Sequence, residues 1–268
     1  MLREGGRAWA RYIVAARRDG GAQTVSAQAV LEQELGLLAY EAQDRATAEI
    51  SVWQARGYRL LTIKDSDYPE NLRVIANRPP LLFVVGELDG DDRRSVSVIG
   101  TRNPTDSARV LAAEVAAGLS DAGFTVFSGL AKGVDTYVHT AVLERSGRTV
   151  AVIGTGLDHA FPAENLTLQR QIASRGAVIS QFWPESEGSR HSFPARNAVM
   201  SGLTLGSVIV EASPTSGTRI QARHALEQGR KLVLMERLLA LEWAAELVGQ
   251  PGVTVAATAD DVLAALRQ

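Results

Sequence analysis

The chain has 268 residues, 46% of them hydrophobic, and its 28 basic and 30 acidic side chains leave a formal net charge of −2. These values exclude a disordered chain and argue against a protein with an overall basic surface for nucleic acid. The absence of cysteine excludes disulfides, thiolate zinc sites and cysteine nucleophiles. Without an apolar run of ~20 residues or a signal peptide, the sequence predicts a cytoplasmic protein that does not contact a membrane.

Residues 1–57 are rich in alanine and in helix-forming residues, so we expect a small helical N-terminal region there. Two short apolar strands follow, at Leu60–Ile63 and Leu81–Val85. The proline pair at residues 79–80 sets an extended entry into the second strand. The acidic segment GELDGDD at residues 86–92 is interpreted as a solvated linker.

From about residue 95, short β-branched runs alternate with amphipathic segments of helical length. The runs lie at residues 95–100, 124–129, 148–154, 177–182, 207–212, 231–235 and 253–257. Apolar strands that alternate with helices predict a parallel sheet covered on both faces. Because crossovers are right-handed, we expect an α/β fold with an extended Rossmann-like, doubly wound, mostly parallel sheet over residues 58–268.

Ligands of open parallel sheets bind at the carboxyl ends of the strands, where loops lead into helices. Four of the five such loops carry cations, namely Arg102, Lys132, Arg190 with Arg196, and Arg219. These loops also contain small residues, whose backbone N–H groups can approach an anion closely. Cations gathered at one sheet edge repel each other unless an anion or carboxylates lie between them, which favours an anion site over separate surface ion pairs.

Other loop residues have more than one interpretation. Asp135 is interpreted as an early-helix acid, and His139 as a packed, hydrogen-bonded histidine rather than a metal ligand. Glu211 is either a general acid–base or a loop anchor. Phe193 either stacks on a base or anchors its loop, and Asn197 either contacts the ligand or ties down the loop. The loops contain no pair of carboxylates, which favours binding over catalysis, and we predict no catalytic residue and no metal site.

Common nucleotide motifs are absent from the sequence. In the dinucleotide fingerprint G-x-G-x-x-G, which would begin at Gly154 and Gly156, His159 stands in place of the third glycine. Neither a P-loop nor a G-x-S-x-G nucleophile motif occurs. These observations exclude a dinucleotide-dependent dehydrogenase, a Walker-type ATPase and a serine hydrolase of the elbow type.

The loops taken together resemble the DprA/Smf family, bacterial DNA-processing proteins that load recombinase onto incoming single-stranded DNA. The matching segments run from about Tyr58 to about Leu234: DSDYPENL, PPLLFVVGEL, VIGTRNP, FSGLAKGVDTYVH, VAVIGTGLDHAFPAEN, SFPARNAVMSGL and VIVEASPTSGTRIQARHALEQGRKL. The resemblance implies a basic pocket and groove for single-stranded DNA, no cofactor, a homodimer and the recombinase RecA as a partner. The family's C-terminal winged-helix domain is not expected here, and the Pro-Gly that usually follows the last matched strand is missing.

The residues and the resemblance together assign a set of DNA- and phosphate-binding residues. They are Gly100, Thr101, Arg102, Ser128, Gly129, Lys132, Gly133, Phe193, Arg196, Asn197, Ser216, Gly217 and Arg219. The implied function is a recombination mediator that protects single-stranded DNA and loads recombinase, in natural transformation, recombination or phage defence. Two alternatives stay open: a sensor of a nucleotide-derived ligand, and a phosphoribohydrolase of the LOG type. Against the enzyme, the loop from Pro214 ends in Gln221, which cannot act as a general acid or base.

Overall fold

The computed structural model describes residues 38–213 and 217–267. The chain divides into two compact units, residues 1–57 and residues 58–268. Most of the predicted helical N-terminal region, residues 1–37, lies outside the described residues. The described part of the first unit is helix α3 (Leu38–Ala55), which contains neither glycine nor proline and is followed by Gly57 in a left-handed conformation, with φ of 79°.

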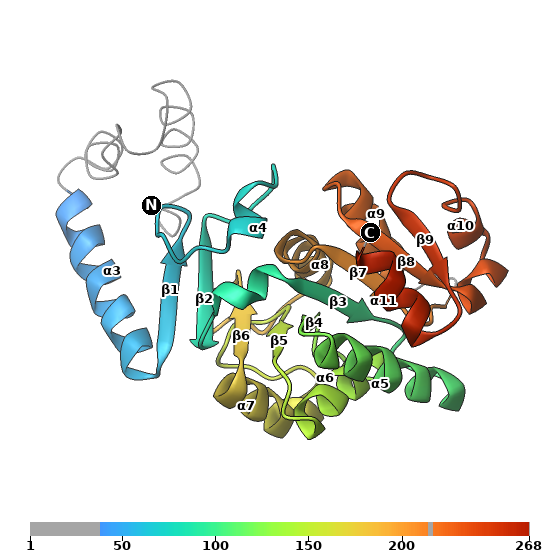
Figure 1. The fold of residues 1–268 in the computed structure, drawn as a ribbon. Helices are drawn as coiled ribbons and strands as arrows, with labels where there is room; N and C mark the ends of the chain where they lie inside the picture. The colour runs from blue at the N-terminus through green and yellow to red at the C-terminus, as the bar shows by residue number, and fades with distance from the viewer. Residues whose placement is uncertain (1–37, 214–216, 268) are drawn as a thin grey trace. The chain divides into compact units, whose positions relative to one another are not determined.

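The second unit is built around one nine-stranded sheet (Figure 1), with the strand order β1-β2-β6-β5-β4-β3-β7-β8-β9. The strands are β1 (Tyr58–Thr62), β2 (Leu81–Gly86), β3 (Ser95–Ile99), β4 (Thr125–Ser128), β5 (Thr149–Val152), β6 (Ala177–Ser180), β7 (Gly206–Ile209), β8 (Lys231–Met235) and β9 (Val253–Ala256). The β1–β2 and β2–β6 pairs are antiparallel, and the other pairs are parallel. The expected α/β class with a mostly parallel, Rossmann-like sheet is confirmed.

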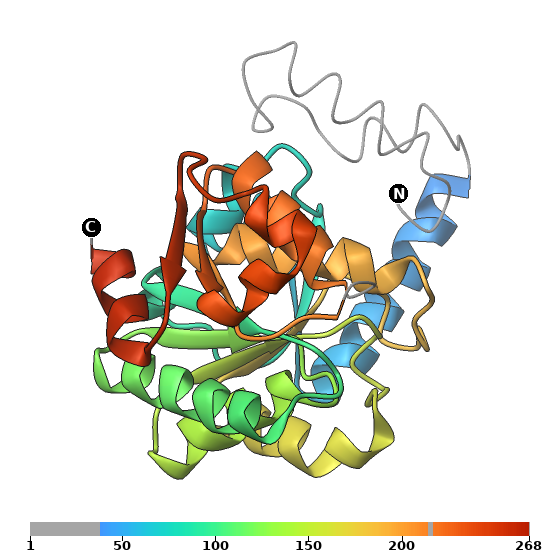
Figure 2. The same ribbon diagram turned by 90° about the vertical axis from the view of Figure 1, so that its right-hand side faces the viewer.

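Helices cover both faces of this sheet (Figures 1 and 2). The first face carries α5 (Asp106–Asp121), α6 (Val134–Glu144), α7 (Leu166–Arg175) and α11 (Ala259–Arg267). The second face carries α4 (Glu70–Arg73), α8 (Ser192–Leu203), α9 (Thr218–Glu227) and α10 (Glu242–Ala245). Short 3₁₀ turns complete the unit: η1 (Gly90–Arg93), η2 (Ala163–Asn165) and η3 (Glu236–Ala240).

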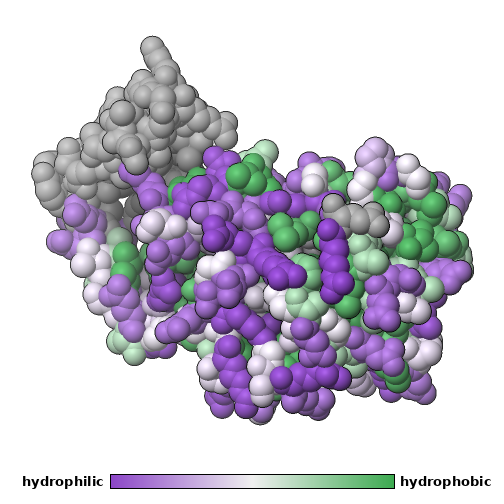
Figure 3. Space-filling view, in the orientation of Figure 1, coloured by the Kyte–Doolittle hydropathy of each residue, from purple (hydrophilic) through white to green (hydrophobic). Residues whose placement is uncertain are grey.

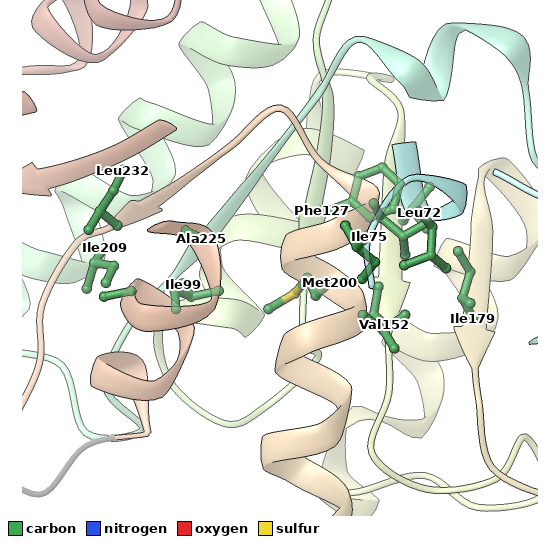
Figure 4. Close-up of a cluster of buried hydrophobic side chains, with 14 of the residues drawn as sticks. Leu72, Ile75, Ile99, Phe127, Val152, Ile179, Met200, Ile209, Ala225 and Leu232 are labelled. Atoms are coloured by element: carbon green, nitrogen blue, oxygen red, sulfur yellow. The ribbon is translucent and has the colours of Figure 1, made fainter. Parts of the chain in front are cut away.

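Each face has its own hydrophobic core, because successive strand residues point to opposite sides of the sheet. Val96 and Val98 of β3 pack with α5, α6 and α11, whereas Ile99 packs on the opposite side with Met200 of α8. Figure 4 shows the second core, in which α8 and α9 pack against the strands. Two rigid layers therefore hold the ends of the central strands and the loops that follow them.

The acidic segment 86–92 is largely exposed, as expected, but it is held in place by the fold, so its interpretation as a linker was wrong. Asp89 caps η1 by accepting a hydrogen bond from the backbone N–H of Asp91. The carboxylate of Asp92 accepts two hydrogen bonds of 2.7 Å from Arg148, and its side chain is only 11% exposed. The partner lies 56 residues away in sequence, so only the tertiary fold reveals that the segment is tied to the start of β5.

None of the helices in the described parts of the chain has the length and apolarity needed to cross a membrane. The face of the molecule in Figure 3 is largely hydrophilic and is interrupted by separate hydrophobic areas.

Candidate functional site

The sheet reverses its direction of growth between β3 and β7. From β3 the chain adds β4, β5 and β6 on one side, and it then crosses to place β7 on the other side of β3. The loops after two such neighbouring strands diverge and leave a crevice where ligands of this fold class bind. A pocket of about 480 Å³ lies at this point, and we call it the switch-point pocket.

The switch-point pocket collects side chains from the loops after β3, β4 and β7 and from the start of α8. Its described lining consists of Ile99, Gly100, Thr101, Arg102, Asn103, Ala131, Asp135, Arg190, Phe193, Pro194, Arg196, Asn197, Met200, Ser213, Gly217, Thr218 and Ile220. This set contains three arginines and one carboxylate, so the pocket carries an excess of positive charge. Seven of the thirteen residues expected from the sequence are among them.

Arg196 is the most constrained cation of the pocket, with only 6% of its surface exposed. Its Nη1 donates to the carbonyl oxygens of Gly129 and Val152, at 2.5 and 2.6 Å, and its Nε donates to Oδ1 of Asn197 at 2.9 Å. Burial lowers the pKa of its guanidinium, an effect that the charge of Asp135 partly offsets. Within the described residues, no carboxylate pairs with Arg196 and its Nη2 has no hydrogen-bond partner, so this nitrogen remains available to an anion.

Asp135 orders the loop between β4 and α6. The side chain is 5% exposed and accepts hydrogen bonds from the backbone N–H groups of Gly129 and Ala131, at 3.1 and 3.3 Å. Burial raises the pKa of this carboxyl, while Arg196 and these hydrogen bonds oppose the shift. Its position near the start of α6 agrees with the expected early-helix acid.

Two glycines allow the loops after β3 and β4 to interlock. Gly133 has φ of 88°, and a Cβ there would lie 2.5 Å from the carbonyl oxygen of Thr101. A Cβ on Gly100 would lie 2.5 Å from Cγ2 of Val134. The backbone N–H of Thr101 donates to the carbonyl of Glu211 at 2.8 Å, which fixes the loop after β3 against the loop after β7.

Phe193 is half-buried at the first turn of α8, where its ring both anchors the loop and lines the pocket. Its ring packs so closely on Gly154 that a Cβ there would approach Cδ1 to 2.6 Å, and this contact anchors the loop. The ring also lines the pocket, with the guanidinium carbon of Arg102 5.6 Å from its centroid. A second aromatic ring, that of Phe161, lies 5.2 Å away between centroids.

The remaining expected residues lie elsewhere or below the surface. Ser128 is fully buried and donates to the carbonyl of Val98 at 2.7 Å, so it supports the strands and does not line the pocket. Gly129 and Gly133 are buried, and they shape the loop beneath the pocket. Lys132 lies in a neighbouring cleft, and exposed Arg219 does not line the pocket. Ser216 lies outside the described residues.

Some residues that line the pocket were not predicted from the sequence. Asn103 directly follows the Gly-Thr-Arg segment, and Thr218 begins α9. The adjacency of Asn103 to the motif was a usable signal. Thr218 lies between Gly217 and Arg219, which were both predicted, so its position in that loop was also a usable signal.

The ambiguity of Glu211 is settled in favour of a loop anchor. Its carboxylate accepts hydrogen bonds from the backbone N–H and the hydroxyl of Thr105, at 2.9 and 2.8 Å, and from Arg237 at 3.3 Å. Gln221 is fully buried and donates to the hydroxyl of Ser207 at 3.1 Å. Neither side chain lines the switch-point pocket, whose described lining contains Asp135 as its single carboxylate.

His139 is packed inside the protein, as expected. Because its ring is buried and neutral, we expect the stability of the protein to depend on pH. Thr149 donates its hydroxyl proton to the carbonyl of Val126, so the hydroxyl accepts from Nδ1–H of His139 at 2.7 Å, and the ring is neutral. Burial lowers the pKa of His139 to about 3, compared with about 6.5 in an unfolded chain. Below pH ~6.5 the unfolded state therefore binds a proton that the folded state does not, and the folded state loses stability as the pH falls.

We expect this single group to remove up to about 1.4 kcal/mol of unfolding free energy per pH unit between about pH 6.5 and pH 3. Urea unfolding of the wild type and of His139→Gln, from above about pH 7 down to about pH 3, measures this loss of stability. The difference between the two proteins should be constant above about pH 7 and should change progressively below it. Parallel curves over the whole range would show that His139 titrates normally.

Comparison with known proteins adds to this geometry. Residues 59–267 match the model of the family described as DNA recombination-mediator protein A. The chain belongs to this family. It is 39% identical over 181 residues to the protein Smf of Synechocystis, a match that covers 66% of this chain and 46% of the relative, so the chain spans about half the length of this curated relative.

Two solved structures of the family are similar to this one. The X-ray structure of DNA processing protein A from Streptococcus pneumoniae has a TM-score of 0.77 and 28% identity, and the match covers 97% of this chain and 93% of that one. DNA processing protein A from Helicobacter pylori has a TM-score of 0.69 and 25% identity, with 78% and 95% covered; its structure is described as revealing a single-stranded DNA-binding mode.

Proposed function

We propose that this chain binds single-stranded DNA in the switch-point pocket and acts as a recombination mediator that protects the strand and delivers it to a recombinase. The observation that carries the proposal is Arg196, a buried guanidinium that lines the pocket without a carboxylate within ion-pair distance among the described residues. A buried charge without a partner is costly, and a phosphate at Nη2 would offset that cost. The single-stranded DNA-binding mode described for the Helicobacter pylori relative supports the same ligand.

The remaining pocket residues fit a strand of nucleotides better than an isolated anion. Arg102 and Arg190 supply further phosphate contacts at the pocket rim, and the ring of Phe193 offers a face on which a base can stack. These contacts read no base edge, so the binding would be nearly independent of sequence and strongly dependent on salt. We further propose that the protein acts without catalysis, as a cytoplasmic homodimer with RecA as its partner, whether in transformation, in recombination or in phage defence.

The expected result for Arg102→Ala is a roughly tenfold weaker affinity for single-stranded DNA and a salt slope reduced by about one. Arg102 is exposed, and its guanidinium lies over the ring of Phe193 without a carboxylate partner among the described residues, so the variant should fold like the wild type. Mobility shifts with single- and double-stranded oligonucleotides over a salt series measure both quantities. Arg145→Ala is the matched control, because Arg145 is an exposed arginine paired with Asp121 at 2.9 Å at the far end of α6.

Two outcomes would contradict the proposal. One is the absence of single-stranded DNA binding by the wild type at low salt. The other is equal binding by the wild type and Arg102→Ala together with equal salt slopes. Release of a free base from nucleoside monophosphates by the wild type would instead identify an enzyme.

A further inference from the structure

A second cleft opens beside the switch-point pocket, and its volume is also about 480 Å³. Its walls come from the loops after β3 and β4, the first turns of α5 and α6, and the segment before α7. The side chains that define its chemistry are Arg102, Arg109, Lys132, Tyr137 and Glu164. Three cations against one carboxylate give this cleft a positive excess, as in the pocket.

The cleft and the pocket lie next to each other. Arg102 and Asn103 line both of them, so a chain that passes Arg102 leaves one cavity and enters the other. Phe161 strengthens the connection, because its exposed ring contacts Phe193 of the pocket and the next residue, Pro162, lines the cleft. A polymeric ligand held in the pocket is therefore directed towards the second cleft.

Tyr137 provides an exposed aromatic surface in the cleft. It lies on α6, whose buried face is formed by residues such as Val134, Val138 and Ala141, and 38% of the tyrosine is exposed. The guanidinium carbon of Arg109 lies 5.7 Å from the centroid of its ring. The ring is not part of either hydrophobic core, and an aromatic side chain with a neighbouring cation is what a nucleobase stacks on in sequence-independent binding.

The cations of the cleft are free to receive a phosphate. The ammonium of Lys132 has no hydrogen-bond or ion-pair partner in the part of the chain that the structure describes, and its side chain is exposed. Arg109 pairs with Asp106 at 3.0 Å, but the aspartate is 94% exposed. Exposed pairs of this kind contribute little, so a phosphate can compete with Asp106 for the guanidinium.

We propose that this cleft is a second nucleotide subsite for single-stranded DNA, in which Tyr137 and Arg109 hold a base while Lys132 and Arg102 bind the phosphates that lead to it from the switch-point pocket. The inference rests on the proposed function, because its ligand is the same strand. It adds that the footprint extends along α6 and that the strand leaves the pocket past Arg102.

The test is a length series. Labelled oligothymidylates of increasing length are titrated with the wild type, Tyr137→Ala, Tyr137→Phe and Arg109→Gln, with Arg145→Gln as the matched control, and binding is followed by fluorescence anisotropy. The shortest oligonucleotides fill only the pocket, and we expect all five proteins to bind them alike. Beyond the length that reaches the cleft, Tyr137→Ala should bind at least about 5-fold more weakly than the wild type, Arg109→Gln should also be weaker, and Tyr137→Phe and the control should match the wild type.

The outcomes separate this inference from the proposed function. If the wild type binds no oligonucleotide, both fail. If the wild type binds and Arg102→Ala weakens binding, while Tyr137→Ala and Arg109→Gln match the wild type at every length, only the second subsite is wrong. Two further results would overturn the second subsite. If Tyr137→Ala weakens binding equally at all lengths, the cleft is not a separate subsite. If Tyr137→Phe weakens binding as much as Tyr137→Ala, the ring does not act by stacking. Thermal unfolding of each variant confirms that the exposed substitutions leave the fold intact.

Discussion

Replacement of Arg196 by methionine is expected to lower the free energy of unfolding by about 3–5 kcal/mol and to abolish binding of single-stranded DNA at moderate salt. Methionine retains most of the side-chain volume but removes the donors to the carbonyls of Gly129 and Val152. It also leaves Asp135 buried without the positive charge that opposes the rise of its pKa. Urea denaturation and fluorescence anisotropy with a labelled oligonucleotide measure the two effects.

A double variant separates the structural role of Arg196 from its role in binding. Arg196→Met combined with Asp135→Asn removes both buried charges, and we expect it to regain part of the lost stability. It should still fail to bind DNA, because the guanidinium that donates hydrogen bonds to the phosphate is absent. Recovery of binding by the double variant would show that Arg196 acts only through the fold.

The second large effect is expected at Gly133. Gly133→Ala should cost about 2–5 kcal/mol of unfolding free energy, because alanine is strained at φ of 88° and ψ of −130° and its Cβ would lie 2.5–2.6 Å from backbone atoms of Thr101 and Arg102. Relief of that overlap requires the loop after β3 to move, and this displaces Arg102 from the pocket. We therefore expect DNA affinity to fall at temperatures where the variant is still folded.

Gly229→Ala is the matched control for this prediction. Gly229 also has a positive φ, of 66°, but a Cβ there meets no atom within 4 Å. It should cost only roughly 1 kcal/mol and should leave DNA binding unchanged. Equal losses of stability in the two variants, with binding retained in Gly133→Ala, would show that the contact between the loops after β3 and β4 does not position Arg102.

The sequence predicted the sheet well because each central strand is buried on both faces. A buried strand such as SVSVI of β3 must be apolar or small throughout, and it stands out between amphipathic helices. The nine expected strands are all present, and their ends differ by a few residues because hydrophobic runs extend beyond the last ladder hydrogen bond. The segment 86–92 was misinterpreted because its partner, Arg148, is distant in sequence.

The candidate site could be predicted only in part. Parallel topology places all strand-to-helix loops at one edge, so the meeting of Arg102 with Arg196 follows from the pattern. The direction in which each side chain points does not follow from the sequence pattern. Ser128 and Lys132 belong to the same loop motif, yet one is buried below the pocket and the other faces the next cleft. Such differences of a few ångströms depend on turn geometry and helix packing, which local sequence does not specify.

Photocrosslinking tests the central claim most directly. An oligothymidylate that carries 5-iodouracil is irradiated with the wild-type protein, and the crosslinked peptides are identified by mass spectrometry. Because Phe193 is the aromatic ring that lines the switch-point pocket, we predict a crosslink within the segment 190–197, lost on addition of unlabelled single-stranded DNA and retained with duplex DNA. Crosslinks confined to other parts of the chain, or a segment 190–197 that is never crosslinked while the oligonucleotide is bound, would contradict the account.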